Sequence, residues 1–301
     1  MKWETLYCPN RSCHHYGRPF GQGLLVKNGT SHGKKQALCR SCGRRVSLTY
    51  GTAYFDLEAD PALFELTVRA LAEGNSIQGT ARIVQIDKDT VCAWLNRAAH
   101  PCRRVMLSHW RDLPVTECQL DEWWSFVHTK EQNLTAARQV VKRREKGRVV
   151  EVTRKIVWGS ADEIQARLAV SPTSTTINTR FVERDNLAWR EHNRRLTRKT
   201  TAFSKELPWM EKQLWLSLAY YHFCLPHLSL REELPTPEPT RGHGSPRRWR
   251  PVTPAMAVGM TDHVWTTAEL LGYRVPASLL DTLDAIQHLF PALDDEAHHV
   301  N

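Results

Sequence analysis

Residues 177–205 read INTRFVERDNLAWREHNRRLTRKTTAFSK and carry the acid Glu183 ahead of a run of cations. Positions three, four and seven apart share a face of a helix, so the stretch predicts a helix with Glu183 and Arg190 on one side. Asp185 would lie about 200° away from Glu183. One acid on a helix face that also carries cations is typical of a metal ligand beside phosphate, and a solvated basic helix has the same pattern. The remaining members of the predicted face are Asn186, Leu187 and Arg194.

The chain has 301 residues, which is enough for two or three domains, and 41% of them are hydrophobic. Its 41 Lys and Arg outnumber 32 Asp and Glu, and the net charge of +9 favours a polyanionic partner. The sequence opens with polar residues and contains no apolar run of membrane-spanning length. We therefore expect a cytoplasmic protein that does not enter a membrane. In that compartment the eight cysteines favour metal binding or free thiols over disulfides.

Two close cysteine pairs stand near the N-terminus, Cys8 with Cys13 and Cys39 with Cys42. Two such pairs separated by a loop predict a tetrahedral zinc site, and Gly43 would permit the tight turn behind the second pair. A site closed by four thiolates has no open position for a substrate, so its zinc would serve folding. Three histidines could substitute as ligands: His14, His15 and His32. Five cations would give this module a basic surface: Lys34, Lys35, Arg40, Arg44 and Arg45.

Residues 61–99 read as three helices, starting at Pro61, at Ile77 and after Asp87, which would cap the third. A helix, a short helix, a turn and a helix at this spacing resemble a helix-turn-helix DNA reader. A plain three-helix scaffold is the alternative. The expected inward residues are Leu63, Leu66, Val68, Leu71, Val91, Trp94 and Leu95. The candidates to face a DNA groove are Lys88, Asp89, Thr90 and Arg97.

Residues 100–118 are predicted to form a connector, and a strand should follow, because apolar Leu120, Trp124 and Phe126 alternate with polar positions. Asp121 would lie near the start of that strand. A carboxylate on a central strand is costly to bury without a cation, which makes Asp121 a candidate metal ligand. Residues 138–158 predict a basic hairpin that turns at 145–147 and either contacts phosphate or is simply solvated.

Residues 208–225 predict a helix whose buried face carries Leu214, Leu218 and Tyr221. Residues 233–254 are rich in Pro, Gly and Arg and predict a loop. Three arginines surround Trp249 in this loop and either contact DNA or keep the loop soluble. They are Arg247, Arg248 and Arg250.

Taken together, these motifs resemble the insertion-sequence-one type of bacterial transposase. The resemblance rests on the cysteine module, the helix-turn-helix pattern, LDEWWSFV at 120–127, the stretch at 177–205, LSLAYYHFC at 216–224 and RPVTPAMAVGMTDHVW at 250–265. It covers about residues 6 to 275. The block around Glu183 is its most specific part.

The resemblance implies an RNase H-like catalytic domain of the DDE type. Two aspartates and a glutamate of that family hold two divalent metal ions, usually Mg²⁺, for attack on DNA phosphodiesters. Asp121 matches the first ligand and Glu183 the third. The second has no match, because Asp162 is the only aspartate between them and does not end a strand pattern. The segment that should carry the second aspartate is missing, so we interpret the chain as internally deleted and expect impaired catalysis.

The expected fold is multidomain α+β. A zinc-ribbon-like module would span 1–55, a helix-turn-helix domain 56–102, a truncated RNase H-like domain 117–232, and a Pro/Arg-rich loop with a tail 233–301. The expected partner is double-stranded DNA with the element's terminal inverted repeats, bound by a homo-oligomer in a synaptic complex. An inactive DNA-binding derivative and a zinc/helix-turn-helix regulator remain alternatives. The cations expected to follow DNA phosphates are Arg190, Arg194, Arg195, Arg198 and Lys199.

Overall fold

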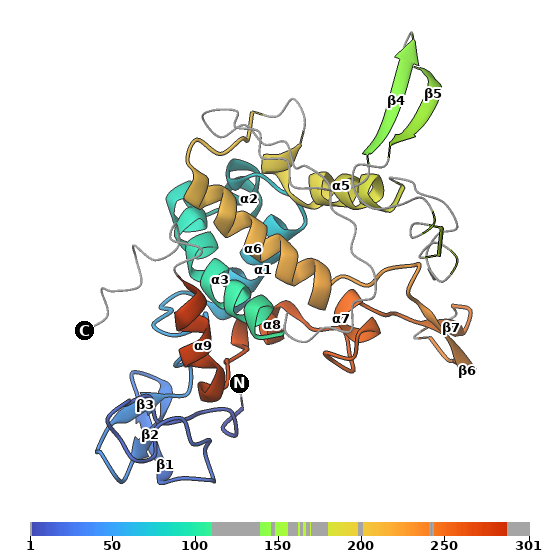
Figure 1. Cartoon of the computed structure of the whole chain (residues 1–301). Coiled ribbons are helices and arrows are strands. Elements are labelled where there is room, and N and C mark those ends of the chain that lie inside the picture. The colour runs from blue at the N-terminus through green and yellow to red at the C-terminus, as the bar shows by residue number, and fades with distance from the viewer. Residues whose placement is uncertain are drawn as a thin grey trace. The chain divides into compact units, whose positions relative to one another are not determined.

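The computed structural model describes residues 2–109, 139–145, 148–155, 180–197, 201–240 and 244–287, with five isolated positions besides (Figure 1). The expected strand with Asp121 and the cations Arg198 and Lys199 lie outside the described residues. The chain divides into two compact units, one formed by 1–113 with 192–301 and the other by 114–191. The described part is mixed α and β with three small antiparallel sheets.

The first unit begins with a three-stranded antiparallel sheet of β1 (Leu25–Ser31), β2 (Lys34–Cys39) and β3 (Arg45–Ser47). Val26 pairs with Leu38 and Ala37 with Val46 in its register. The inward side chains of this sheet and of the preceding loop form a small core of their own. That core contains Leu6, Leu25, Ala37 and Val46 beside three of the cysteines.

Helices make up most of the remainder of this unit: α1 (Pro61–Ala72), α2 (Ile77–Val84), α3 (Lys88–His109), η1 (Arg194–Leu196), α6 (Leu207–Phe223), α7 (Pro254–Ala257), α8 (Thr267–Gly272) and α9 (Ala277–Gln287). Local sequence explains the starts of the first three helices. Side-chain oxygens of Asp60, Ser76 and Asp87 accept backbone N–H bonds of the first turns, of 3.1, 3.1 and 2.7 Å. The three helices thus form where the sequence predicts them, with Val91, Trp94 and Leu95 buried as expected.

The main core joins α1 and α3 to α6, which lies alongside them (Figure 1). Phe64 of α1 packs edge-on against Trp94 of α3, with 5.5 Å between the ring centroids. Gln213 of α6 donates a 3.1 Å hydrogen bond to the carbonyl of Leu71, the last turn of α1. Helices that the sequence assigned to different domains therefore share one core.

Helix α3 is longer than the sequence suggests. Residues 100–109 were expected to form a connector, and they instead continue the helix through Pro101. A proline inside a helix removes one backbone hydrogen bond. Cys102, Val105 and Met106 are completely buried in the main core, and burial of each such side chain contributes about 1.5–3 kcal/mol, which outweighs that loss.

The buried faces of two helices also differ from expectation. In α6 the buried side chains include Leu216, Tyr220 and Phe223, while Leu214, Leu218 and Tyr221 are only half-buried. This helix is apolar on several sides, so periodicity does not select the buried face. In α1 the expected Val68 and Leu71 are fully buried together with Phe64, whereas Leu66 is exposed and Leu63 is half-buried.

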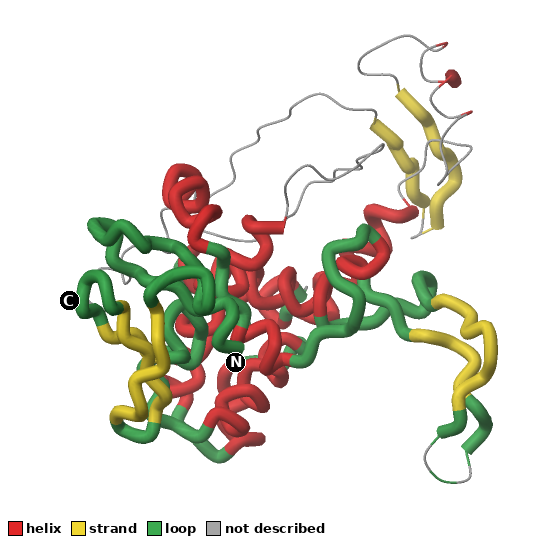
Figure 2. Tube along the Cα trace, turned by 90° about the horizontal axis from the view of Figure 1, so that it is seen from below, coloured by secondary structure: helices red, strands yellow, loops and turns green. Residues whose placement is uncertain are grey.

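Residues 233–254 do not form a simple loop. Strands β6 (Glu232–Glu238) and β7 (Arg247–Arg250) pair as an antiparallel hairpin that extends away from the helices (Figure 2). Pro235 and Pro237 fit into β6 because a two-stranded sheet leaves one edge of each strand unpaired. Composition alone predicted a loop because prolines are rare inside larger sheets.

The second unit contains the basic hairpin that the sequence predicts. Strands β4 (Gln139–Glu145) and β5 (Arg148–Lys155) are antiparallel, and Arg143 bonds Glu145 and Glu151 at 2.6 and 3.0 Å. Helix α5 (Arg180–His192) follows. Nowhere in the described residues is there a helix long and apolar enough to cross a membrane.

Candidate metal centre and nucleic-acid interface

Four thiols converge beside the first sheet. Cys8 and Cys13 lie in the N-terminal loop, Cys39 ends β2, and Cys42 lies in the turn before β3; their sulfurs all lie within 4.8 Å of one another. This confirms the grouping that the cysteine spacing predicts. The three histidines that were considered as substitutes are not part of the cluster.

The distances between sulfurs match a tetrahedral ion. Sγ of Cys8 lies 3.7 Å from Sγ of Cys42, and Sγ of Cys13 lies 3.8 Å from Sγ of Cys39. A zinc ion with bonds of about 2.3 Å places its sulfurs about 3.8 Å apart, whereas a disulfide needs about 2.05 Å. The four cysteines could therefore hold a metal ion such as zinc, and the donor set suits zinc.

Backbone turns orient the cysteine thiols. Gly43 adopts a φ of 69°, and its N–H donates a 2.8 Å hydrogen bond to the carbonyl of Cys39. The N–H of His15 points at the sulfur of Cys13 at 3.4 Å. A glycine is the residue that adopts this left-handed turn at no steric cost, as the sequence predicts for the position after Cys42.

The protein environment shifts the pKa values of two of these thiols in opposite directions. The backbone N–H of Arg44 is the main cause that lowers the pKa of Cys42 to about 6. Burial raises the pKa of Cys8 to about 12. Four thiols this close cannot all ionise without a cation between them, because like charges repel. A divalent ion that replaces the thiol protons would resolve this conflict.

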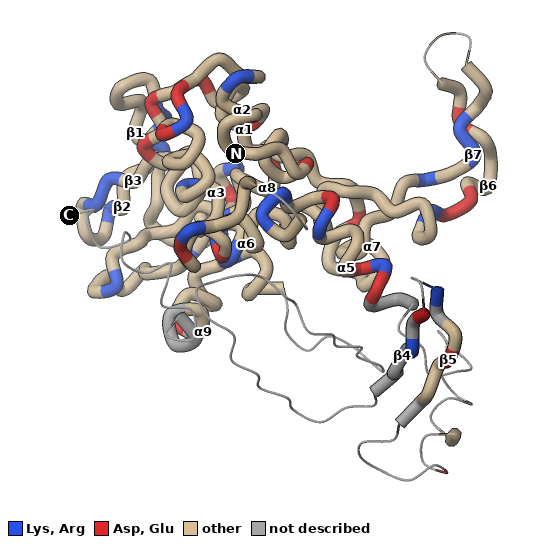
Figure 3. Tube along the Cα trace, turned by 90° about the horizontal axis from the view of Figure 1, so that it is seen from above, with Lys and Arg blue, Asp and Glu red and all other residues tan. Residues whose placement is uncertain are grey.

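Cations surround this module. Lys35, Arg40, Arg44 and Arg45 are exposed and Lys34 is half-buried. Figure 3 shows Lys and Arg along β2 and β3. The module therefore carries exposed cations, as its sequence predicts.

The α2–α3 turn presents the first turn of α3 to solvent. Gln85 adopts a left-handed conformation with a φ of 57°, which turns the chain between the two helices. Lys88 and Asp89 are exposed and Thr90 is half-buried. Arg97 differs, because its Nη1 donates hydrogen bonds to the backbone carbonyls of Phe55 and Ala53. Nη1 of Arg97 thus links α3 to the backbone of residues 53–55.

The stretch around Glu183 is helical, as predicted, but its single face is shorter. Helix α5 ends at His192, and Asn193 caps the following turn, where its Oδ1 accepts a 3.0 Å bond from the N–H of Arg195. Arg194 therefore does not continue the stripe of Glu183 and Arg190. The reason is local, since an asparagine side chain competes for backbone hydrogen bonds.

The side chains of this stretch have different environments. Glu183 is exposed, Asn186 is buried and Arg190 is half-buried. Arg195 donates a 2.7 Å bond to the hydroxyl of Ser204, and burial lowers the pKa of Arg195. Over the part of the chain that the structure covers, Glu183 belongs to no group of three potential metal ligands. Its predicted partner, Asp121, lies outside the described residues.

No protein-family model matches the chain, and neither a curated protein nor a solved structure matches it.

Proposed function

We propose that this chain is a zinc-stabilised DNA-binding protein of the insertion-sequence-one transposase type, which binds the terminal inverted repeats of its element. The observation that carries the proposal is the cluster of four thiols with tetrahedral spacing beneath exposed cations. Zinc in such a site would hold a small module in shape, and Arg40, Arg44 and Arg45 would contact phosphates.

Helices α1 to α3 support the same function. All three pack on one another, and the left-handed Gln85 lies in the turn before α3. In a helix-turn-helix protein the second helix of the pair lies in the major groove with its N-terminal residues on the base edges. Lys88 and Thr90 would take those positions. Arg97 would contribute by supporting the helix.

For catalysis, this chain supplies fewer candidate metal ligands than the family pattern requires. Asp121 and Glu183 would hold Mg²⁺, which in such sites activates the attacking oxygen for in-line attack on a phosphodiester. Glu183 is exposed on α5 and so is accessible to a metal ion. Because the sequence supplies no second aspartate, we propose that cleavage and strand transfer are impaired while DNA binding is retained.

One experiment separates binding from catalysis. The full chain is incubated with duplexes that carry the inverted repeats of its own element, and binding and Mg²⁺-dependent strand cleavage are measured for wild type, Asp121→Ala and Glu183→Ala. We expect salt-sensitive binding by all three and little cleavage. Strand cleavage by wild type that both substitutions abolish would overturn the proposal that catalysis is impaired. No preference for the repeats over unrelated duplex would overturn the transposase assignment.

An inactive derivative or a zinc/helix-turn-helix regulator is the second candidate, favoured by the missing aspartate. A regulator predicts that substitution of Glu183 leaves every property unchanged. Truncation at residue 102 is a poor test, because it would cut α3 and remove Val105, Met106 and α6 from the shared core. The substitution in the full chain is therefore the appropriate comparison.

A further inference from the structure

The β6–β7 hairpin is built as a surface element. Every described residue from 231 to 250 is exposed except Leu234, which is half-buried. None of them belongs to either of the two cores found among the described residues. A two-stranded hairpin without a core is only marginally stable by itself, and its exposed side chains are accessible to another molecule.

Ion pairs and a ring contact set the shape of the hairpin. Arg250 pairs with Glu232 at 3.2 Å, and Arg247 pairs with Glu238, both across the strands. The guanidinium of Arg231 lies over the indole of Trp249, 4.3 Å from its centroid. This cation–π contact holds the indole in place, and 39% of the Trp249 surface remains exposed.

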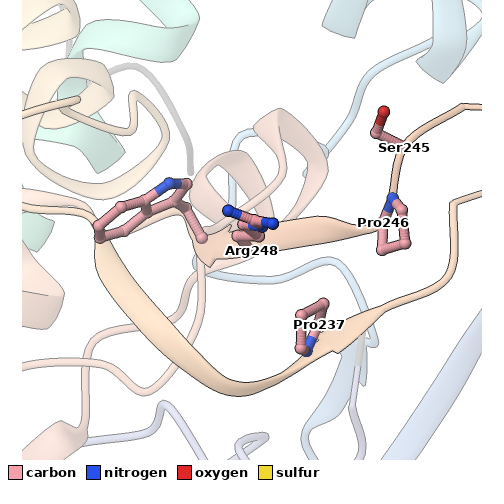
Figure 4. A pocket seen from close by; sticks show the side chains of 5 residues that line it. Pro237, Ser245, Pro246 and Arg248 are labelled. Atoms are coloured by element: carbon pink, nitrogen blue, oxygen red, sulfur yellow. The ribbon is translucent and has the colours of Figure 1, made fainter.

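A hollow of about 480 Å³ opens beside this tryptophan. The hollow is lined by Pro237, Ser245, Pro246, Arg248 and Trp249. Pro246 and Arg248 lie on the β7 side of the hairpin, and Pro237 lies on β6 (Figure 4). The hollow is an open depression of the surface rather than an enclosed cavity. Arg248 forms no ion pair with any described carboxylate. The hollow thus combines flat apolar walls with a cation that pairs with no carboxylate of the described residues.

We propose that this hairpin binds an unpaired stretch of DNA, with a base stacked at Trp249 and its phosphate beside Arg248. Single-strand binders combine aromatic rings with cations in this way. In a duplex the faces of the bases are stacked on one another, so the indole could contact only the edges or the backbone. The inference rests on the proposed function for the choice of DNA, and it assigns the single strand to a site distinct from the four-thiol module and α3.

The test uses the full chain and a labelled oligodeoxythymidine, followed by fluorescence anisotropy. Trp249→Ala should weaken single-strand binding about tenfold or more, and Trp249→Phe should retain most of it. Arg248→Ala should also weaken it and should flatten the salt dependence. Leu228→Ala, which removes an exposed apolar side chain outside the hairpin, is the matched control for the tryptophan. Arg69→Ala on α1 is the control for loss of charge, and thermal unfolding of each variant confirms folding.

Binding of a duplex and of poly-glutamate is measured in parallel. Loss of single-strand affinity in Trp249→Ala with duplex affinity unchanged supports the proposal. Equal losses in Trp249→Ala and Leu228→Ala, or equal losses for single strand and duplex, overturn it. Competition by poly-glutamate as effective as that by the oligonucleotide would indicate an acidic protein partner and overturn it as well. Wild type that binds duplex repeats but no single strand refutes only the hairpin site, whereas the reverse refutes only the proposed function.

Discussion

Nη2 of Arg274 donates a 2.6 Å hydrogen bond to the backbone carbonyl of Leu48, a residue 226 positions earlier in the chain. The same guanidinium donates from Nε to the carbonyl of Tyr50 at 2.7 Å and from Nη1 to the hydroxyl of Thr5 at 2.7 Å. Arg274 is only 5% exposed and follows α8. One buried cation therefore fastens the four-thiol module to the helical part of the same unit.

Substitution of Arg274 should destabilise this junction. Arg274→Met keeps much of the side-chain volume but leaves two half-buried carbonyls without their charged donor, which should cost about 2–4 kcal/mol of unfolding free energy. Denaturant unfolding measures the change. Hydrogen exchange should show faster exchange in residues 46–55, with α6 unaffected. A loss below about 0.5 kcal/mol would show that the three bonds contribute little beyond what water supplies.

Gly17 makes a second close approach at the same junction. A Cβ at Gly17 would lie 2.7 Å from Cβ of Ala277 in α9, and Gly17 has a φ of 72°. Gly17→Ala should therefore cost about 2–4 kcal/mol, from backbone strain and the clash together. Gly21→Ala is the matched control, because Gly21 has a φ of 88° with nothing within 4 Å, and it should cost only about 1 kcal/mol. Ala277→Gly added to Gly17→Ala should recover part of the loss; no recovery would contradict the clash.

The four-thiol cluster predicts one zinc ion per chain. Cys39→Ser should abolish zinc retention after gel filtration, because a serine hydroxyl is a poor substitute for a thiolate, and the module should lose its protection from proteolysis. Cys92→Ser is the control, since Cys92 is half-buried on α3 outside the cluster. Metal analysis of both variants beside wild type provides the measurement. Equal zinc content in all three would refute the site.

His222 should make stability depend on pH. Burial, with a smaller contribution from His227, lowers the pKa of His222 from 6.5 to about 4. Because the pKa of His222 is lower in the folded state, the unfolded chain binds the proton more tightly. The stability that neutral His222 contributes is therefore present above pH 6.5 and is lost as the pH falls towards 4. The loss is roughly 3 kcal/mol. Unfolding curves from pH 7 to 4 measure it, and a His222→Gln variant should show a shallower slope. Identical slopes would assign the effect to other groups.

Lys88 and Arg97, two cations of α3, should respond differently to substitution. Lys88 is exposed, so Lys88→Ala should weaken duplex binding, reduce the salt slope by about 1 and leave the unfolding midpoint unchanged. Arg97 bonds the carbonyls of Ala53 and Phe55, so Arg97→Ala should lower the unfolding midpoint. Binding and thermal unfolding of both variants, measured side by side, decide between the roles. Unchanged stability in Arg97→Ala would return Arg97 to the groove-facing set.

Local features of this protein could be predicted from its sequence. The cysteine pairs, the cap at Asp87 and the β4–β5 hairpin depend on residues within a few positions of one another. Short-range steric and hydrogen-bonding preferences are sufficient to fix them. The helix around Glu183 is likewise predictable from residues close to it in the sequence.

Tertiary structure alone decided the remainder. The continuation of α3 beyond Pro101, the buried face of α6, and the bonds of Arg274 and Arg97 all depend on partners far away in the chain. An apolar helix such as α6 offers several possible faces, and only the shape of the core selects one. An arginine in the sequence can serve DNA or a distant carbonyl equally well. Which of the two it serves is set by the position of the acceptor in space.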